Sequence, residues 1–180
     1  MPFAREEAVG GEEHHENGCA IGRRGDGRPI RPYIGRMTAP LYNTEILRLA
    51  ATIPYQERLA EPTASSEKRS PVCGSRVTVD VVTDAEGRVS EVGMLVRACA
   101  LGQASSSLLA SHVIGRSPAE LATARDALTA WLAGAGPVPD WPGLDIFTPA
   151  LPHSARHASI RLAFEAAAEA AAAASLQRAA

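Results

Sequence analysis

Residues 70–97, SPVCGSRVTVDVVTDAEGRVSEVGMLVR, carry the pattern that decides the fold. Apolar and polar residues alternate in both halves of this stretch, and the apolar positions are Val77, Val79, Val81, Val92, Met94 and Val96. Alternation with a period of two is typical of strands that bury one face. The DAEGR segment between the two halves has the composition of a turn. The stretch therefore predicts an antiparallel β-hairpin.

A cysteine lies just outside each end of this hairpin. Cys73 precedes the first strand, and Cys99 follows the second. Antiparallel pairing returns the two ends of a hairpin to the same end of the sheet, so we expect the two thiols to lie close together. Cys99 also directly precedes a helical stretch, where free N–H groups and the positive end of the helix dipole favour a thiolate.

The residues alone leave the role of these cysteines open. Its sequence context is compatible with four roles for Cys73: a buried apolar residue, one half of a disulfide, a nucleophile or a metal ligand. Three cysteines in the chain are an odd, low number that does not indicate a disulfide framework. The spacing does not form a C-x-x-C zinc motif. His157, in the first turn of the expected last helix, is a third candidate for the same site.

Helical patterns surround the hairpin. Residues 41–53 carry apolar side chains at helical spacing, with Asn43 or Thr44 as the cap. The segment Ser117-Pro118-Ala119-Glu120 has the N-cap serine, N1 proline and N3 acid that open a helix. Residues 65–70 allow at most one weak edge strand. The expected fold class is α+β: a small antiparallel β-sheet of two to three strands covered by helices, ending in a long alanine-rich helix over residues 154–174.

Length and composition exclude several functional classes. A chain of 180 residues is one domain plus appendages. The formal net charge of −2 provides no basic surface for nucleic acid. No stretch approaches the roughly 20 apolar residues that span a bilayer, and the first residues lack the basic-then-apolar order of a signal peptide. We therefore expect a cytoplasmic protein that binds neither nucleic acid nor membranes.

The first 36 residues differ from the rest. Acidic EEAVGGEEHHE is followed by basic RRGDGRPIRP without any apolar period, so we expect residues 1–36 to be disordered and the domain to cover residues 37–180. His14, His15 and Cys19 are interpreted as incidental residues of this polar segment. Met37, directly before the first regular pattern, is an alternative start. Deletion of residues 1–36 is expected to leave thermal stability and metal content unchanged.

Three segments resemble the SufU/IscU/NifU-N family of iron–sulfur cluster assembly scaffolds: PVCGSRVTVDV, RACALGQASSSLLASHVIG and RHASIRLAFEA. In that family the first cysteine lies in a P-x-C-G-D turn before a strand. The second lies in a G-C-x-[IL]-[SG]-x-A-S-x-S turn that opens a small-residue helix, and the third opens the C-terminal helix. Cys73-Gly74 and residues 99–107 match the first two motifs. The resemblance covers residues 40 to about 170, and the long interval after Cys99 is similar to the SufU branch.

Two positions depart from the family pattern. Ser75 stands where the family has an aspartate that binds metal or modulates cluster lability. His157 stands at the third cysteine when HASIRL is aligned with CATLSW, which keeps the apolar positions Ile160 and Leu162 in register. A one-residue shift instead pairs His157 with the histidine before that cysteine and places Ala158 at the cysteine. Both registers leave two thiolates and one imidazole.

The resemblance implies a scaffold and sulfur acceptor rather than an enzyme in the usual sense. It would receive sulfur from a SufS-like cysteine desulfurase and pass clusters to apo iron–sulfur proteins or carriers. Cys73, Cys99 and His157 would bind iron or a cluster, with Ser75 as a weak ligand and Cys99 as the sulfur acceptor. The alternatives are a zinc-bound sulfur-transfer protein and a degenerate, metal-free interaction module.

Other polar residues have simpler interpretations. The arginines beside the candidate ligands are interpreted as solvated charges at the ends of strands and helices, with steering of a persulfide as the alternative; they are Arg76, Arg97 and Arg156. His112 is interpreted as a half-buried core histidine. The serines at 105–107 fit close packing of a small-residue helix better than a nucleophile, because no G-x-S-x-G elbow is present.

Overall fold

The computed structural model describes residues 40–179, which lie within one unit of the chain. The predictions for residues 1–36, including those for His14, His15 and Cys19, fall outside the described residues. Along the chain the elements are α1 (Thr44–Ala51), β1 (Ala64–Arg69), β2 (Arg76–Thr83), β3 (Val89–Arg97), α2 (Ala100–His112), α3 (Pro118–Leu132), the 3₁₀ helix η1 (Leu144–Ala150) and α4 (Ser154–Ala179). The α+β prediction is confirmed.

The sheet has the strand order β1-β2-β3, and both pairings are antiparallel. The predicted hairpin is formed by β2 and β3, with Val79 opposite Met94 and Arg76 opposite Arg97. The weak edge strand is also present, because β1 pairs with β2 along its whole length. The last pair, Arg76 with Arg97, places the start of β2 beside the end of β3, so the residues that flank the hairpin meet at one end of the sheet.

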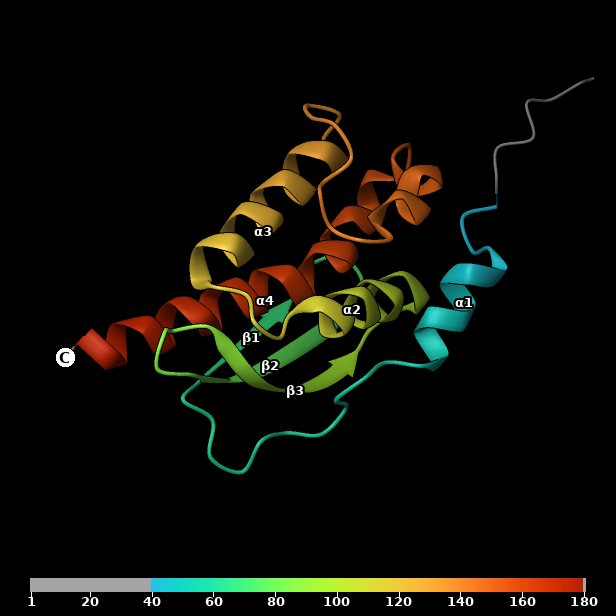
Figure 1. Cartoon of the computed structure of the whole chain (residues 1–180). Helices are drawn as coiled ribbons and strands as arrows, with labels where there is room; N and C mark the ends of the chain where they lie inside the picture. The colour runs from blue at the N-terminus through green and yellow to red at the C-terminus, as the bar shows by residue number, and fades with distance from the viewer. Residues whose placement is uncertain (1–39, 180) are drawn as a thin grey trace, which may run out of the picture. The chain divides into compact units, whose positions relative to one another are not determined.

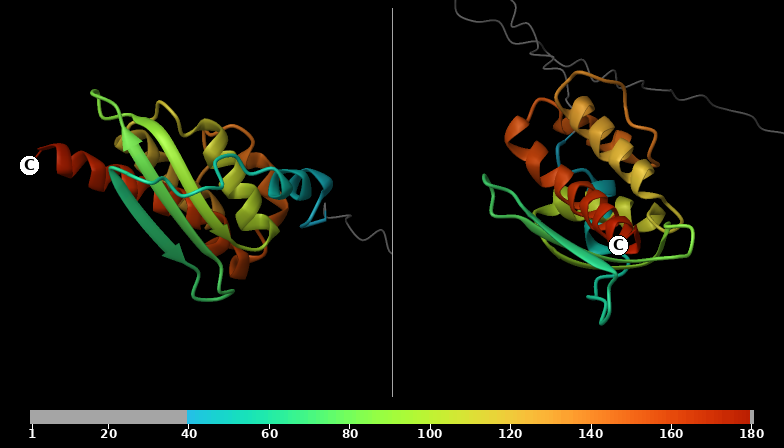
Figure 2. Two further views of the ribbon diagram at one scale, coloured as in Figure 1. Left: turned by 90° about the horizontal axis from the view of Figure 1, so that it is seen from below. Right: turned by 90° about the vertical axis from the view of Figure 1, so that its left-hand side faces the viewer.

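Helices cover one face of the sheet. Figures 1 and 2 show α2 and α4 lying on this face, with α3 on the outer side of α4 and α1 beside α2. The apolar side chains of the strands point into this layer, so Val77, Val79, Val81 and Met94 are all fully buried. The hydrophobic effect of burying this alternating set holds the helices on the sheet.

The segment before β1 runs over the opposite face of the sheet, as the view from below in Figure 2 shows. Its backbone is hydrogen-bonded to β3, because Met94 N donates to Tyr55 O at 2.8 Å and to Glu57 O at 3.1 Å. The second face of β2 is therefore buried as well, including the carboxylate of Asp80. Arg58 and the backbone N–H of Leu59 donate hydrogen bonds to that carboxylate, which satisfies the buried charge.

The helix boundaries follow the local signals in the sequence. Asn43 caps α1 by accepting from Ile46 N at 2.9 Å, and the capping box of Ser117 and Glu120 opens α3 as predicted. α4 extends to Ala179, beyond the predicted end at 174, because its alanine-rich tail favours the helix throughout. The 3₁₀ helix η1 was not predicted. None of the helices within residues 40–179 is long and apolar enough to cross a membrane.

The serines of α2 are packing residues, as the sequence suggested. Ser105, Ser106 and Ser107 are all almost completely buried. Their hydroxyls donate to backbone carbonyls rather than to a catalytic partner: Ser105 to Ile160 O at 2.6 Å, and Ser107 to Thr52 O at 3.2 Å. These bonds tie α2 to α4 and to the end of α1, so α2 is fixed from both sides.

Candidate functional site

Cys73 lies in the turn between β1 and β2. The turn is closed by Ser70 N, which donates to Ser75 O at 2.8 Å. The hydroxyl of Ser70 also accepts from the backbone N–H groups of Val72 and Cys73, at 3.3 and 3.4 Å. Gly74 follows with φ +68°, a left-handed conformation that glycine adopts without strain. The P-x-C-G pattern therefore builds a turn that holds the cysteine in one place.

Two serine hydroxyls contact the sulfur of Cys73. Its Sγ lies 3.2 Å from Ser70 Oγ and 3.1 Å from Ser75 Oγ. As a thiol, Cys73 has a single proton, which it donates to one of these oxygens; as a thiolate, it accepts from both hydroxyls. Cys73 is half-buried, whereas its neighbour Val72 is 66% exposed. The sulfur is therefore hydrogen-bonded from the protein side and close to the surface on the other.

Cys99 lies at the N-cap of α2, two residues after the end of β3. It is free and half-buried, like Cys73. Its Sγ is 3.2 Å from Ser159 Oγ of α4, and its backbone N–H donates to Ser75 Oγ at 3.4 Å. The side chain makes no capping hydrogen bond to α2, so the sulfur points away from the helix backbone toward α4.

Ser75 and Ser159 connect the two cysteines. Ser159 Oγ donates to Ser75 Oγ at 3.2 Å, and each serine contacts one of the two sulfurs. The exposed fractions of Ser75 and Ser159 are only 4% and 1%. An unbroken chain of polar contacts thus runs from Cys73 through Ser75 and Ser159 to Cys99. The prediction that the hairpin brings Cys73 and Cys99 to one end of the sheet agrees with this geometry.

His157 is directed elsewhere. Its Nε2 lies 3.0 Å from Ala150 O, at the end of η1. His157 and Ser159 are two residues apart on α4, which places their side chains about 200° apart around the helix. Ser159 faces Cys99, so His157 faces away from it. Within residues 40–179, no three His, Cys, Asp or Glu side chains lie close enough together to hold a metal ion as a group.

The hydrogen bonds in the turn change the acidity of Cys73. Burial raises the pKa of its thiol, but the hydroxyls of Ser70, Ser75 and Ser159 and the backbone of Ser75 outweigh this effect and lower the pKa to about 7. A thiolate is both the nucleophilic and the metal-binding form of cysteine. A large fraction of Cys73 is therefore in the reactive form near neutral pH.

This acidity gives a direct prediction for the metal-free protein. The rate of alkylation of Cys73 by iodoacetamide, followed by mass spectrometry, is expected to rise with pH and to reach half its maximum near pH 7. A short cysteine peptide, with a pKa of about 8.5, serves as the control. Ser75→Ala should move the Cys73 profile to higher pH, because it removes a hydroxyl that stabilises the thiolate. A Cys73 profile that coincides with that of the peptide would contradict the hydrogen-bonding account.

The donor set fits a soft metal or an iron–sulfur cluster. Thiolates are the preferred ligands of zinc and of iron–sulfur clusters, and Cys73 and Cys99 supply two of them. The hydroxyls of Ser75 and Ser159 are oxygen donors between the sulfurs. Two sulfurs and weak oxygens leave positions for ligands from outside the chain, such as sulfide, water or a partner's side chain.

The structure also describes three other polar residues that the sequence singled out. Arg76 pairs with Glu67 at 3.6 Å, and Arg97 is exposed. His112 is half-buried and packs edge-to-face against Trp141, with ring centroids 6.4 Å apart. These contacts agree with the interpretation of His112 as a core residue.

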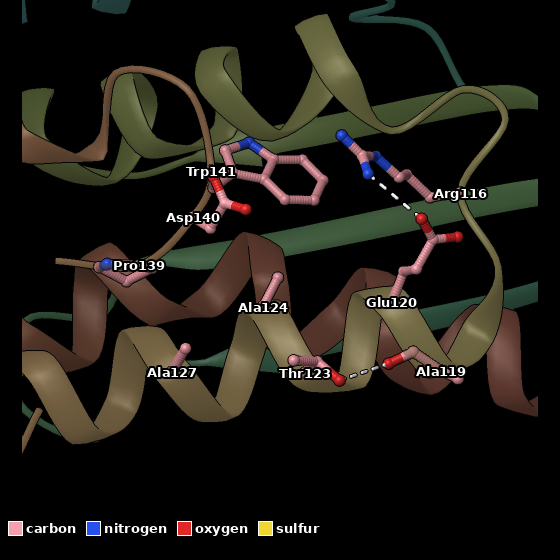
Figure 3. Close-up of a pocket in the computed structure, with 9 residues that line it drawn as sticks. All are labelled: Arg116, Ala119, Glu120, Thr123, Ala124, Ala127, Pro139, Asp140 and Trp141. Atoms are coloured by element: carbon pink, nitrogen blue, oxygen red, sulfur yellow. Dashed lines mark hydrogen bonds and ion pairs between the residues drawn. The ribbon is translucent and has the colours of Figure 1, made fainter. Parts of the chain in front are cut away.

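A hollow of about 440 Å³ lies elsewhere, between α3 and the segment before η1. Figure 3 shows Arg116 beside the indole of Trp141 and paired with Glu120 along one side of this hollow. Its lining contains no cysteine or histidine. The hollow therefore offers no thiolate or imidazole ligand.

Two residues of the site, Ser70 and Ser159, are not indicated by the sequence motifs. Ser159 lies in the third matched segment, two residues after His157, and its small polar side chain in an otherwise apolar helix face was the available signal. Ser70 directly precedes the proline of the first motif, where a serine commonly accepts hydrogen bonds from the following turn. Neither signal distinguishes a site residue from a local cap.

Two solved structures have a similar fold, and the first of them identifies the family. The N-terminal part of a nitrogen-fixing NifU-like protein from Brucella abortus matches with a TM-score of 0.71 and 40% sequence identity, covering 76% of this chain and 96% of that chain. A protein from Fervidobacterium islandicum, described as an iron–sulfur cluster assembly scaffold of the SUF system, matches with a TM-score of 0.67, covering 73% of this chain and 96% of that one. At 17% identity, the second match shows the fold alone.

No protein-family model matches the sequence, and the comparison with curated proteins gives no match. The identity and coverage of the NifU-like match are nevertheless sufficient. The chain belongs to the SufU/IscU/NifU-N scaffold family.

Proposed function

We propose that this protein is a scaffold for iron–sulfur cluster assembly, with Cys73 and Cys99 as its thiolate ligands. The observation that carries the proposal is the meeting of both cysteines at one end of the sheet, joined through Ser75 and Ser159. The family supports the same function. Iron and sulfide are then cargo that the site collects and passes on to apo iron–sulfur proteins or carriers in the cytoplasm.

The ligand set that we propose contains only two strong ligands, the thiolates of Cys73 and Cys99. The sequence-based prediction includes His157 as the third ligand, and binding there requires its imidazole to leave Ala150 O. Serine hydroxyls bind metal more weakly than thiolates do, so this site is expected to hold its cargo less firmly than one built from three cysteines and an aspartate. Weak retention suits a protein that must release what it assembles.

Cys73 is the better placed residue to receive sulfur from a cysteine desulfurase. The sequence predicted Cys99 as the sulfur acceptor, because the dipole of α2 favours a thiolate there. In the structure, however, hydrogen bonds from Ser70 and Ser75 stabilise a thiolate at Cys73, and this residue lies beside the exposed Val72. In the transfer step, the thiolate attacks the outer sulfur of the desulfurase persulfide. A new S–S bond forms on the acceptor, the old S–S bond breaks, and the desulfurase cysteine leaves as a thiolate, so no external oxidant or reductant is needed.

The test is desulfurase-driven assembly without oxygen. With a SufS-like desulfurase, cysteine and Fe²⁺, the wild-type protein is expected to develop the visible absorption of an iron–sulfur cluster. Cys73→Ala and Cys99→Ala should each lose nearly all of this absorption, whereas Cys19→Ala, the remaining cysteine of the chain, should retain it. With iron omitted, mass spectrometry should detect the added sulfur on Cys73 and not on Cys73→Ala. Labelling confined to Cys99 would assign the acceptor role to that residue instead.

The same assembly experiment distinguishes an iron–sulfur scaffold from a zinc-bound sulfur-transfer protein. The two thiolates that suit iron–sulfur clusters also suit zinc, so a zinc-bound sulfur-transfer protein would accept sulfur but form no cluster chromophore. A metal-free interaction module would neither accept sulfur nor bind either metal. Persulfide formation, metal content and cluster absorption therefore give a different combination for each of the three functions.

A further inference from the structure

Ser159 occupies the centre of the cysteine site. Its hydroxyl lies 3.2 Å from Cys99 Sγ and donates to Ser75 Oγ at 3.2 Å, and Ser75 Oγ in turn lies 3.1 Å from Cys73 Sγ. The residue is only 1% exposed. It is thus a buried polar group that contacts the sulfur of Cys99 directly and is linked to the sulfur of Cys73 through Ser75.

We infer that Ser159, and not His157, supplies the third side chain of the Cys73–Cys99 site, so that a metal bound there meets two sulfurs and the Ser159 oxygen. This inference rests on the proposed function and adds the identity of the third donor. Serine is a poor ligand as a neutral hydroxyl and a good one once a metal displaces its proton. The site therefore holds metal with two thiolates and one oxygen donor, which binds soft metals less firmly than a third thiolate would.

The orientation of α4 decides between the two residues. A helix turns about 100° per residue, so a rotation that brought His157 to Cys99 would carry Ser159 to the opposite side. Neighbouring side chains fix α4 in its present rotation, because Ile160 and Leu162 are buried in the core and Ser105 Oγ donates to Ile160 O. In this rotation Ser159 contacts a sulfur, whereas the imidazole of His157 contacts Ala150 O.

The close approach of α2 to α4 also fixes the position of Ser159. A Cβ atom at Gly102 would lie 2.7 Å from Ser159 Oγ and 3.0 Å from Ser159 O, which is closer than real contacts allow. The two helices meet here because Gly102 has no side chain. Ser159 is therefore held against the first turn of α2, beside Cys99, by backbone packing as well as by hydrogen bonds.

A pair of cysteine substitutions tests the assignment. Ser159→Cys and His157→Cys each introduce one thiol into the same helix. In the Co²⁺-loaded full-length protein, thiolate-to-cobalt charge-transfer absorption increases with the number of bound thiolates. Ser159→Cys is expected to show absorption for three thiolates and at least tenfold tighter zinc binding, and His157→Cys to match the wild type in both. The reverse pattern would overturn the inference.

Alanine substitutions provide a second readout that does not depend on accommodating a larger sulfur. Ser159→Ala is expected to weaken zinc binding about tenfold, the lower end of the effect of removing a group that supports a metal site, while His157→Ala leaves it unchanged. Equal affinities for wild type and Ser159→Ala would contradict the assignment. Thermal unfolding of each metal-free variant verifies that the fold is retained.

The outcomes separate this inference from the proposed function. If the wild-type protein shows no thiolate-to-cobalt absorption, the proposed function itself fails. If the wild type shows two thiolates but only His157→Cys adds a third, the proposed function stands and the assignment of Ser159 is wrong.

Discussion

Arg58→Met is expected to lower the free energy of unfolding by about 3 kcal/mol. The carboxylate of Asp80 is completely buried in the middle of the sheet, and Arg58 Nη2 donates to its Oδ1 at 2.9 Å. Removing one partner of a buried ion pair costs about 3–5 kcal/mol, because the remaining charge is left uncompensated. The lower end applies because the Arg58 side chain is 48% exposed, which lets water approach the pair. Urea unfolding measures the difference.

The loss should depend on pH. Burial raises the pKa of Asp80, but hydrogen bonds from Arg58, Ser65 and the Leu59 backbone lower it below its usual value. In the wild type, this pair therefore stabilises the fold above the unfolded pKa of about 4 and less as the pH falls below it. In Arg58→Met, burial dominates and the carboxylate takes up a proton more readily, so the two stabilities should converge as the pH falls.

Arg48→Met is the matched control for this prediction. Arg48 pairs with Glu45 on the surface of α1, and both side chains are largely exposed. Exposed pairs contribute little to stability, so no measurable loss is expected. Equal losses for Arg48→Met and Arg58→Met would show that the buried position of Asp80 is not the cause.

Gly102→Ala is expected to destabilise the fold by about 2 kcal/mol and to disturb the cysteine site. Its new Cβ would lie 2.7 Å from Ser159 Oγ and 2.8 Å from Ala98 Cβ, so α2 and α4 must move apart. Overpacking of this kind costs about 1–3 kcal/mol, and it exceeds the gain of up to about 1 kcal/mol that alanine brings to a helix. Separation of the helices also moves Ser159 away from Cys99, so the affinity for zinc should fall together with the stability of the fold.

Gly136→Ala is the control for this substitution. A Cβ at Gly136 would meet Ala130 Cβ at 3.5 Å, an ordinary contact. Neither stability nor zinc affinity is expected to change. If Gly102→Ala behaves like Gly136→Ala, the close approach of the two helices does not hold the site together.

The placement of the two cysteines could be predicted because a hairpin has simple geometry. Alternation at Val77, Val79 and Val81 fixed the first strand, and antiparallel pairing then required the residues before and after the hairpin to meet. The capping box at Ser117 likewise predicted the start of α3. These features depend on local patterns, which a sequence displays directly.

The third member of the site could not be predicted with the same certainty. The side of α4 that faces Cys99 depends on how the helix packs against the rest of the domain. Side chains two residues apart on a helix point to nearly opposite sides, so a small error in the alignment changes which residue faces the cysteine. An alignment of motifs identifies the helix turn but does not resolve whether His157 or Ser159 points inward. The cover over the second face of the sheet was also missed, because the polar segment that contains Arg58 carries no periodic pattern.

Mössbauer spectroscopy of the protein after desulfurase-driven assembly with ⁵⁷Fe tests most directly whether Cys73 and Cys99 hold an iron–sulfur cluster at the end of the sheet. Most of the bound iron in the wild type is expected to give the signal of sulfur-coordinated cluster iron, and the double variant Cys73→Ala/Cys99→Ala is expected to give none. A wild-type spectrum that contains only iron bound by oxygen and nitrogen, or a double variant with the same cluster signal, would show that these cysteines do not hold a cluster.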